Sequence, residues 1–260
     1  MTPRGVKAMK SRIFKSVLLA ASLCMAVSTA SAVPIVFFGE DLSPGGTVPA
    51  GGAAETARNS FLAMLSGVGN EDFESFANLT SIGGPGINVS FPGSGGAITA
   101  NLTGANGGIC DQTIGGAVNG ITCGFQRFAT SGNNYLQNGS NMVLTFTSAI
   151  SAFGFYGTDF GDFDQEITLT LSNGDVQVFV IPSTKGAAAG GNVLFWGMID
   201  PTNSYTSIAF STTGSTDIFG FDDLVIGDQD QIVGVPEPGT LALLGIGLFG
   251  MGLARRRKTA

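Results

Sequence analysis

The stretch Ile167-Thr-Leu-Thr-Leu-Ser-Asn-Gly-Asp-Val-Gln-Val-Phe-Val180 is the part of the sequence that decides the fold. Its two arms alternate apolar with other residues, and side chains two apart lie on the same face of a β-strand. The alternating apolar residues are Ile167, Leu169, Leu171, Val176, Val178 and Val180. Between the arms stands Asn173-Gly174, a pair that favours a tight two-residue turn. The stretch therefore predicts an antiparallel β-hairpin.

Similar short apolar segments occur on both sides of this hairpin. They are Ile35–Phe38, Met142–Thr147, Ala152–Tyr156, Val193–Ile199, Tyr205–Thr212 and Phe219–Ile226. One helix is predicted over Ala54–Leu65, where apolar residues recur at helical spacing and Gly67 follows. Many short strands, one helix and 40 glycines predict a mainly β domain over residues 33–227. We expect an antiparallel β-sandwich with jelly-roll-like topology and one short N-terminal helix.

Residues 1–32 have the three parts of a secretory signal peptide. Five basic residues precede an apolar run, Val17–Val27, which is followed by Ala30-Ser31-Ala32. The alternative is a permanent anchor helix, but a run of about 11 residues is short for a membrane span. Small residues at Ala30 and Ala32 favour cleavage after Ala32.

The carboxy terminus carries a second three-part pattern. Pro236-Glu237-Pro238 is followed by an apolar segment, Gly239–Ala254, and then by Arg255-Arg256-Arg257-Lys258. As a helix the apolar segment would span roughly 24 Å, less than the roughly 30 Å of a bilayer core. Because basic flanks resist translocation, the four cations should stay on the cytoplasmic side. We expect transient membrane insertion through this helix, with residues 228–235 acting as a linker.

The order of these three parts resembles the PEP-CTERM sorting signal. In that family the motif, here Pro236, Glu237 and Pro238, is recognised by the membrane protease-like enzyme exosortase. The family occurs in Gram-negative bacteria that make extracellular polysaccharide. The resemblance, over residues 236–258, implies a protein of the cell envelope, cell surface or exterior whose partners are the secretion machinery and exosortase. The alternative is a plain tail anchor with a proline-rich lead-in.

The region between the two signals is strongly acidic. Of the 12 basic residues only Arg58, Arg127 and Lys185 lie in residues 33–235, whereas 18 of the 19 acidic residues do, so its formal charge is 3 − 18 = −15. Binding to nucleic acid needs a basic surface that neutralises phosphates. The composition therefore excludes a nucleic-acid partner.

Two cysteines, Cys110 and Cys123, remain once the signal peptide is removed. Disulfides persist in the compartments to which exported proteins are delivered. We therefore expect Cys110 and Cys123 to be bonded, the alternative being two separate buried thiols.

Catalytic chemistry has few candidate residues. The chain contains no histidine, which removes histidine-dependent triads and the commonest general base. A carboxylate-dependent glycan-cleaving enzyme is the alternative function, because two placed carboxylates suffice for glycoside hydrolysis. Its candidates are Glu71, Asp72, Glu74, Asp159, Asp162, Asp164 and Glu166. Acidic residues of an acidic protein are usually solvated, so we expect no enzyme.

A structural calcium ion is a further hypothesis. The segments Glu71–Phe76 and Phe219–Leu224 loosely resemble the first and last core strands of calcium-bearing jelly-roll carbohydrate-binding modules. The resemblance implies that Glu74 and Asp222 lie close together and share calcium, an ion that prefers oxygen ligands. The alternative is a pair of exposed acidic strand ends.

The expected role follows from export and from the absence of catalytic motifs. We expect a structural or interaction protein of the cell surface or biofilm matrix, with extracellular polysaccharide as a candidate partner. Trp196, Tyr156 and Tyr205 are candidate sugar platforms, but we expect burial in the core for each. A passive envelope protein without a ligand is equally compatible with the sequence.

Overall fold

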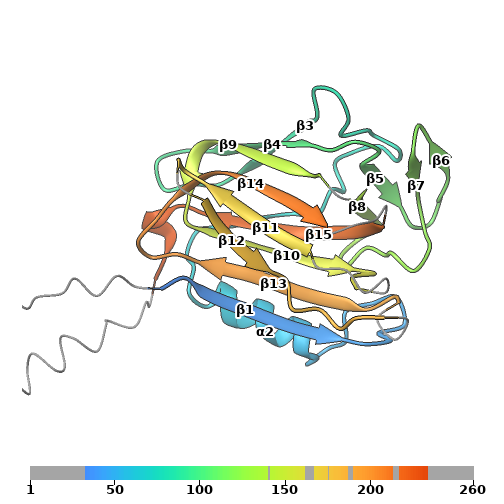
Figure 1. The fold of residues 1–260 in the computed structure, drawn as a ribbon, viewed down its shortest axis with the longest axis horizontal. Coiled ribbons are helices and arrows are strands. Elements are labelled where there is room, and N and C mark those ends of the chain that lie inside the picture. Colours follow the sequence, from blue (N-terminus) through green and yellow to red (C-terminus); the bar gives the residue numbers. More distant parts are fainter. Residues whose placement is uncertain are drawn as a thin grey trace, which may run out of the picture. The chain divides into compact units, whose positions relative to one another are not determined.

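In a computed structural model of the chain, the described residues are 33–139, 141–161, 167–174, 176–186, 190–212 and 217–233. One compact unit, Ala32–Pro236, contains two antiparallel sheets packed face to face and one α-helix (Figure 1). The predicted mainly β sandwich with one short helix is confirmed. Its jelly-roll topology stays a prediction, and the signal-peptide helix and the C-terminal hydrophobic helix that we expect to flank the domain lie outside the described residues.

The larger sheet has seven strands. Across the sheet they are β1 (Ile35–Asp41), β13 (Val193–Ile199), β10 (Ala152–Thr158), β15 (Ile218–Gly227), β8 (Asn134–Gly139) and β5 (Gly108–Asp111), and β2 (Gly69–Glu71) also pairs with β15. A β-bulge interrupts the pairing of β10 with β15 between Gly154 and Tyr156. The bulge lies beside the acidic pair Asp222-Asp223 on β15.

The smaller sheet has six strands. Their order is β12 (Val176–Val180), β11 (Ile167–Ser172), β14 (Tyr205–Thr212), β9 (Val143–Ile150), β4 (Ile98–Thr103) and β3 (Ile87–Phe91). The predicted hairpin is confirmed as β11–β12, with Thr170 opposite Val178. Separate from both sheets, β6 (Ala117–Val118) and β7 (Ile121–Thr122) form a small hairpin.

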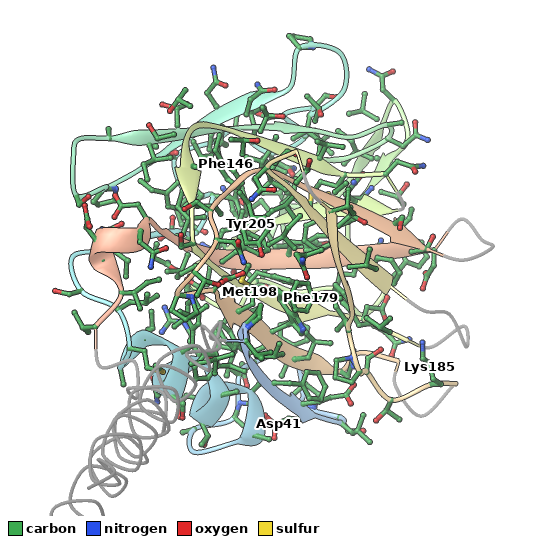
Figure 2. All side chains as sticks on the ribbon, turned by 60° about the vertical axis from the view of Figure 1, so that its left-hand side comes forward. Asp41, Phe146, Phe179, Lys185, Met198 and Tyr205 are labelled. Atoms are coloured by element: carbon green, nitrogen blue, oxygen red, sulfur yellow. A yellow bond between two sulfur atoms is a disulfide. The ribbon has the colours of Figure 1, made fainter. Side chains whose placement is uncertain are left out.

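Aromatic side chains fill the space between the two sheets. Phe155 of β10 packs against Trp196 of β13, with ring centroids 6.2 Å apart, and against Phe210 of β14 at 5.4 Å. Figure 2 shows Met198 and Tyr205 within the body of the domain, and both are buried. Burial of such large apolar side chains stabilises the sandwich.

A second core lies on the outer face of the seven-stranded sheet, where α2 (Ala53–Leu62) packs on β1 and β13 (Figure 1). Phe61 is fully buried there, and Gly154 and Gly197 face one another on β10 and β13. A Cβ atom on Gly154 would lie 2.8 Å from Phe195 Cζ and 3.0 Å from Phe61 Cε1. The two glycines therefore leave room for the Phe61 ring.

The helix is shorter than predicted, ending at Leu62 rather than Leu65. The next residues tighten into turns, in which Met64 N donates to Phe61 O and Leu65 N to Leu62 O. Leu65 then forms an isolated antiparallel bridge with Ile232. Pairing with this distant segment, which helical spacing does not reveal, explains the earlier end.

Residues 228–233, expected to belong to a linker, lie against the domain. They include a short 3-10 helix, η2 (Gln229–Gln231), capped by the Asp228 side chain. Asp228 Oδ2 also accepts hydrogen bonds from Ser94 N at 2.6 Å and Ser94 Oγ at 2.9 Å. The described chain is thus fastened to the sandwich as far as Val233, whose N–H donates to Met64 O.

Candidate functional site

Glu74 and Asp222 bind the same loop, residues 130–134. Glu74 Oε1 accepts hydrogen bonds from Asn133 N at 2.7 Å and Asn134 N at 2.5 Å. Asp222 Oδ2 accepts from Thr130 N at 2.7 Å and Ser131 N at 3.1 Å. Two carboxylates distant in the sequence thus satisfy successive backbone donors of one loop, which fixes its conformation.

Asp222 is a buried carboxylate beside a second one, Asp223. Burial, followed by repulsion from Asp223, raises the pKa of Asp222 well above its ordinary value. Asp223 has a left-handed backbone conformation, φ 51°. Its Oδ1 accepts a hydrogen bond from Asn70 Nδ2 at 2.5 Å, and its Oδ2 accepts one from Thr130 Oγ1 at 2.8 Å. Asp223 therefore has polar partners both on β2, through Asn70, and in the loop at residues 130–134, through Thr130.

This arrangement gives no support to a calcium site. Within the described parts of the chain, no group of three or more His, Cys, Asp or Glu side chains is placed to hold a metal ion. The oxygens of Glu74 and Asp222 accept hydrogen bonds from backbone N–H groups. The hypothesis of shared calcium stays an untested prediction.

The other carboxylates suggested by the sequence fall into two groups. Asp162, Asp164 and Glu166 lie outside the described residues. Glu71 accepts a hydrogen bond from Phe73 N at 2.8 Å, and Asp72 accepts one from Glu74 N at 3.2 Å. These two side chains stabilise local turns, which is a structural role.

Cys110 and Cys123 form the predicted disulfide, with an S–S distance of 2.09 Å and a Cα–Cα distance of 5.4 Å. Cys110 is buried on β5 with Ile121 and Tyr135. Tyr135 Oη accepts a hydrogen bond from Gly124 N at 2.8 Å, directly after the bonded cysteine. The disulfide and this hydrogen bond fasten both the small β6–β7 hairpin and the start of the next loop.

That next loop presents an exposed aromatic ring. The Phe125 side chain is 70% exposed, the largest exposed fraction of any aromatic residue in the described chain. Phe125 and Gln126 have φ angles of 54° and 69°, so two successive residues other than glycine adopt the left-handed conformation. Such backbone strain concentrates at functional sites.

A pocket of about 480 Å³ is lined by the three residues that follow Phe125, Gln126–Phe128, and by two glycine-rich loops. It lies where the loops after β1, after β7 and before β13 meet. Its lining residues are Ser43, Gly45, Gly46, Gln126, Arg127, Phe128, Gly190 and Gly191. Because five of these eight residues are glycine or serine, backbone N–H and C=O groups are accessible in its walls.

The one cation of this pocket is already paired. The buried Arg127 guanidinium lies 3.8 Å from Asp159 Oδ2 and donates to Thr122 O at 2.6 Å. Its Cζ atom lies 5.7 Å from the centroid of the Phe125 ring. The Arg127 guanidinium thus makes a cation–π contact with the Phe125 ring, and Asp159 balances its charge. Because the cation is already paired, the arrangement suits an uncharged ligand.

Sequence reasoning did not single out Phe125. It named Trp196, Tyr156 and Tyr205 as candidate platforms but expected burial for each, and all three are buried. A usable signal was present, because Phe125 stands in Cys-Gly-Phe-Gln, outside any alternating apolar pattern. The signal is a weak one, because Phe128 of the same loop also lies outside any strand and is buried.

The residues of the two predicted sorting signals lie outside the described residues. These are Ala30, Ala32, Pro236, Glu237, Pro238, Arg255, Arg256, Arg257 and Lys258. In the part of the chain that the structure does describe, none of the helices has the length and apolar character of a membrane span.

Comparison with known proteins identifies the carboxy-terminal signal. Residues 234–258 match the PEP-CTERM protein-sorting motif. The motif implies an exported, cell-surface protein of a Gram-negative bacterium and processing by exosortase. No curated protein sequence matches the chain.

Two solved structures have a distant likeness to the chain. A DUF4465 family protein from Bacteroides ovatus is 12% identical, with a TM-score of 0.36 over 61% of this chain and 98% of that one. The K3 cleaved adhesin domain of Lys-gingipain from Porphyromonas gingivalis is 13% identical, with a TM-score of 0.30 over 60% and 96%. Likeness at this level assigns no function to the chain.

Proposed function

We propose that this exported protein is a non-catalytic, saccharide-binding component of the cell surface or its surrounding matrix. The observation that carries the proposal is the exposed Phe125 ring next to a pocket whose one cation, Arg127, is paired with Asp159. Sugar rings stack their apolar faces on aromatic side chains and hydrogen-bond through their hydroxyl groups. Phe125 supplies such a face, while Gln126 and the glycine loops supply polar groups.

Charge favours a neutral saccharide over an acidic one. The domain has a formal charge of −15, so a polyanion would be repelled at long range. Arg127 cannot offset this repulsion because Asp159 already pairs with it. Neutral oligosaccharides are therefore the ligand class that the site supports best.

The absence of catalysis is part of the proposal. Asp159 is engaged with Arg127, and Asp222 with the loop at residues 130–131. Hydrolysis of a glycoside needs one carboxyl group as acid and another as base or nucleophile at the scissile bond. Neither side chain is free for such a role.

The test is a glycan array, followed by titration calorimetry with a positive glycan. Phe125→Ala should weaken binding at least about tenfold, which equals ~1.4 kcal/mol, and Phe125→Trp should retain binding. Ile114→Ala is the matched control, because Ile114 is also 70% exposed and belongs to the same disulfide-bonded loop region.

Two outcomes would contradict the proposal. One is equal loss of binding in Phe125→Ala and Ile114→Ala, which would indicate nonspecific adhesion to apolar surface. The other is release of reducing ends from the bound glycan, which would favour the glycan-cleaving alternative.

A further inference from the structure

Strand β12 lies at one edge of the six-stranded sheet and exposes an apolar stripe. Val176, Val178 and Val180 are 59%, 58% and 51% exposed. On the other side of the strand, Phe179 packs against Trp196 with ring centroids 5.7 Å apart. The strand is therefore anchored to the core through one side chain while its valines face solvent.

The whole six-stranded sheet is uncharged, although the domain is strongly acidic. Strands β3, β4, β9, β11, β12 and β14 contain no Asp, Glu, Lys or Arg. A cross-strand row of uncharged residues runs from the valine edge through Val176, Ser172, Ser207, Thr145, Asn101 and Asn88. Here two copies could approach without like charges meeting.

The other sheet edges carry features that discourage strand pairing. Strand β1 ends in Glu40 and Asp41, and charges at an edge oppose association. Along β5 another chain segment already pairs, since Leu79 N donates to Ile109 O and Ile109 N donates to Thr80 O, both at 2.8 Å.

The fourth edge, β3, is flanked by prolines. Pro92 directly follows it and Pro85 precedes it by two residues. Proline lacks the N–H group that an added strand would need. Asp175 precedes β12 and Pro182 follows it by two residues, but the residues that would pair, Val176–Val180, include no charge and no proline. No described segment pairs with the outer side of β12. An apolar edge without protection is a site of pairing with another chain.

We propose that β12 is a self-association edge, at which a second copy of this chain adds its own β12 in antiparallel orientation. A twofold axis at Val178 places Val178 opposite its counterpart and Val176 opposite Val180 of the second copy. All the valines then lie on one face of a sheet that continues through both molecules. An antiparallel pair of identical strands closes on itself, so the product is a dimer.

A second copy fits this edge better than an unrelated ligand does. The open side of an edge strand offers backbone N–H and C=O groups, which another strand satisfies in register. Cross-strand pairs of β-branched side chains add to the stability of such a pairing. The uncharged sheet keeps the acidic parts of both copies away from the contact, so repulsion is weakest in this orientation.

The test is sedimentation velocity of residues 33–235, the compact unit with its own core, over a range of concentrations. The wild type should show reversible dimerisation that strengthens with salt, because salt screens the acidic surfaces. Val178→Lys should weaken dimerisation at least about tenfold, since it places two ammonium groups opposite one another. Circular dichroism should show an unchanged fold, because Val178 is exposed.

Two matched lysine variants separate edge pairing from other contacts. Thr147→Lys charges the exposed face of β9 in the same sheet, and Ser90→Lys charges the opposite edge strand, β3. Both should dimerise like the wild type. A wild type that stays monomeric at every concentration, or a Thr147→Lys variant as impaired as Val178→Lys, would overturn the proposal.

Cysteine cross-linking tests the register. Val178→Cys should form an intermolecular disulfide on mild oxidation, because directly opposed residues of antiparallel strands lie within disulfide reach. Ser90→Cys should not, and equal cross-linking of the two variants would contradict the assigned register. Val178→Lys should still bind saccharide, so self-association and the Phe125 site can fail independently.

Discussion

Asp222 is a buried side chain whose pKa is lowered by its hydrogen bonds and raised by its burial beside Asp223. Its Oδ2 atom accepts from Thr130 N and Ser131 N, and its Oδ1 atom accepts from Asp223 N at 2.7 Å. These donors favour the carboxylate, whereas burial and the Asp223 charge favour the protonated form. The latter effects dominate and raise the pKa of Asp222, so the folded state binds this proton more tightly than the unfolded chain.

The raised pKa of Asp222 predicts a pH dependence of stability. Between its ordinary value, near 3.8, and the higher pKa in the folded state, only the folded protein binds the proton. This contribution to the free energy of unfolding is complete below pH 3.8 and is lost as the pH rises through the folded pKa. The Asp222→Asn variant should lack this contribution, and urea unfolding at a series of pH values measures the difference.

Removal of the side chain should be more severe at every pH. Asp222→Ala leaves three backbone donors without their acceptor, at ~1–3 kcal/mol each. Asp230→Asn, an exposed control, should change stability by less than about 0.5 kcal/mol. If Asp222→Asn follows the wild type at all pH values, the raised pKa is not the cause of the pH dependence.

At this scale the aromatic residues that were expected to be buried are buried, but the exposed aromatic residue was not identified. Trp196, Tyr156 and Tyr205 are buried, and Phe125 is exposed. Trp196, Tyr156 and Tyr205 all lie in predicted strands and Phe125 does not, but strand periodicity alone does not identify Phe125, because Phe128 of the same loop is buried. Contacts such as that of Glu74 with the loop at 133–134 cannot be read from spacing, because they join residues about sixty positions apart.

The packing of helix α2 on the sheet depends on two glycines, Gly154 and Gly197, which leave room for the Phe61 ring. Gly154→Ala should lower the free energy of unfolding by about 1–3 kcal/mol, because the added methyl group overpacks a filled core. The affected atoms are the rings of Phe195 and Phe61. Gly95→Ala is the matched control, since no atom lies within 4 Å of its added Cβ. Urea unfolding of both variants measures the effect, and equal losses of stability would contradict a packing role for Gly154.

The disulfide-bonded loop is the second element with a measurable contribution. Closing a loop of sequence separation 13 should stabilise the fold by ~3 kcal/mol in the chain-entropy model. The Cys110→Ala/Cys123→Ala double variant should lose about that amount in urea unfolding. It should also bind saccharide less well, because Phe125 lies two residues after Cys123. A reductant should destabilise the wild type and leave the double variant unchanged.

Most strands were predictable because their apolar residues form alternating patterns or, where both faces are buried as in β10 and β13, continuous apolar runs. The predicted segments at 142–147, 152–156, 193–199, 205–212 and 219–226 all contain strands in the structure. Strands β2 to β8 were not predicted individually, since glycines and polar residues interrupt their apolar pattern. The earlier end of α2 and the fastening of residues 228–233 depend on one another through the Leu65–Ile232 bridge, so neither follows from local sequence.

Over the whole molecule, charge is separated between the two sheets. The seven-stranded sheet contains every acidic residue that lies in a strand of the sandwich, and the six-stranded sheet contains none. The sorting signals have the opposite character, with nine of the 12 basic residues. The acidic domain thus has one sheet whose strands carry no charge, the sheet at which we propose self-association, while most basic residues of the chain lie in the sorting signals.

Processing at both ends is the prediction that concerns the complete chain. Mass spectrometry of the mature protein from its native host should find Val33 as the first residue and should find no peptide from Gly239–Ala260. Glu237→Ala should leave the carboxy-terminal segment in place and keep the protein in the membrane fraction, because it removes the carboxylate between the two prolines. Val233→Ala, an exposed change four residues earlier, should be processed normally. A full-length chain in the cytosol, with both Met1 and Ala260 present, would be incompatible with export. Retention of Gly239–Ala260 in the mature wild type would mean that this segment serves as an anchor.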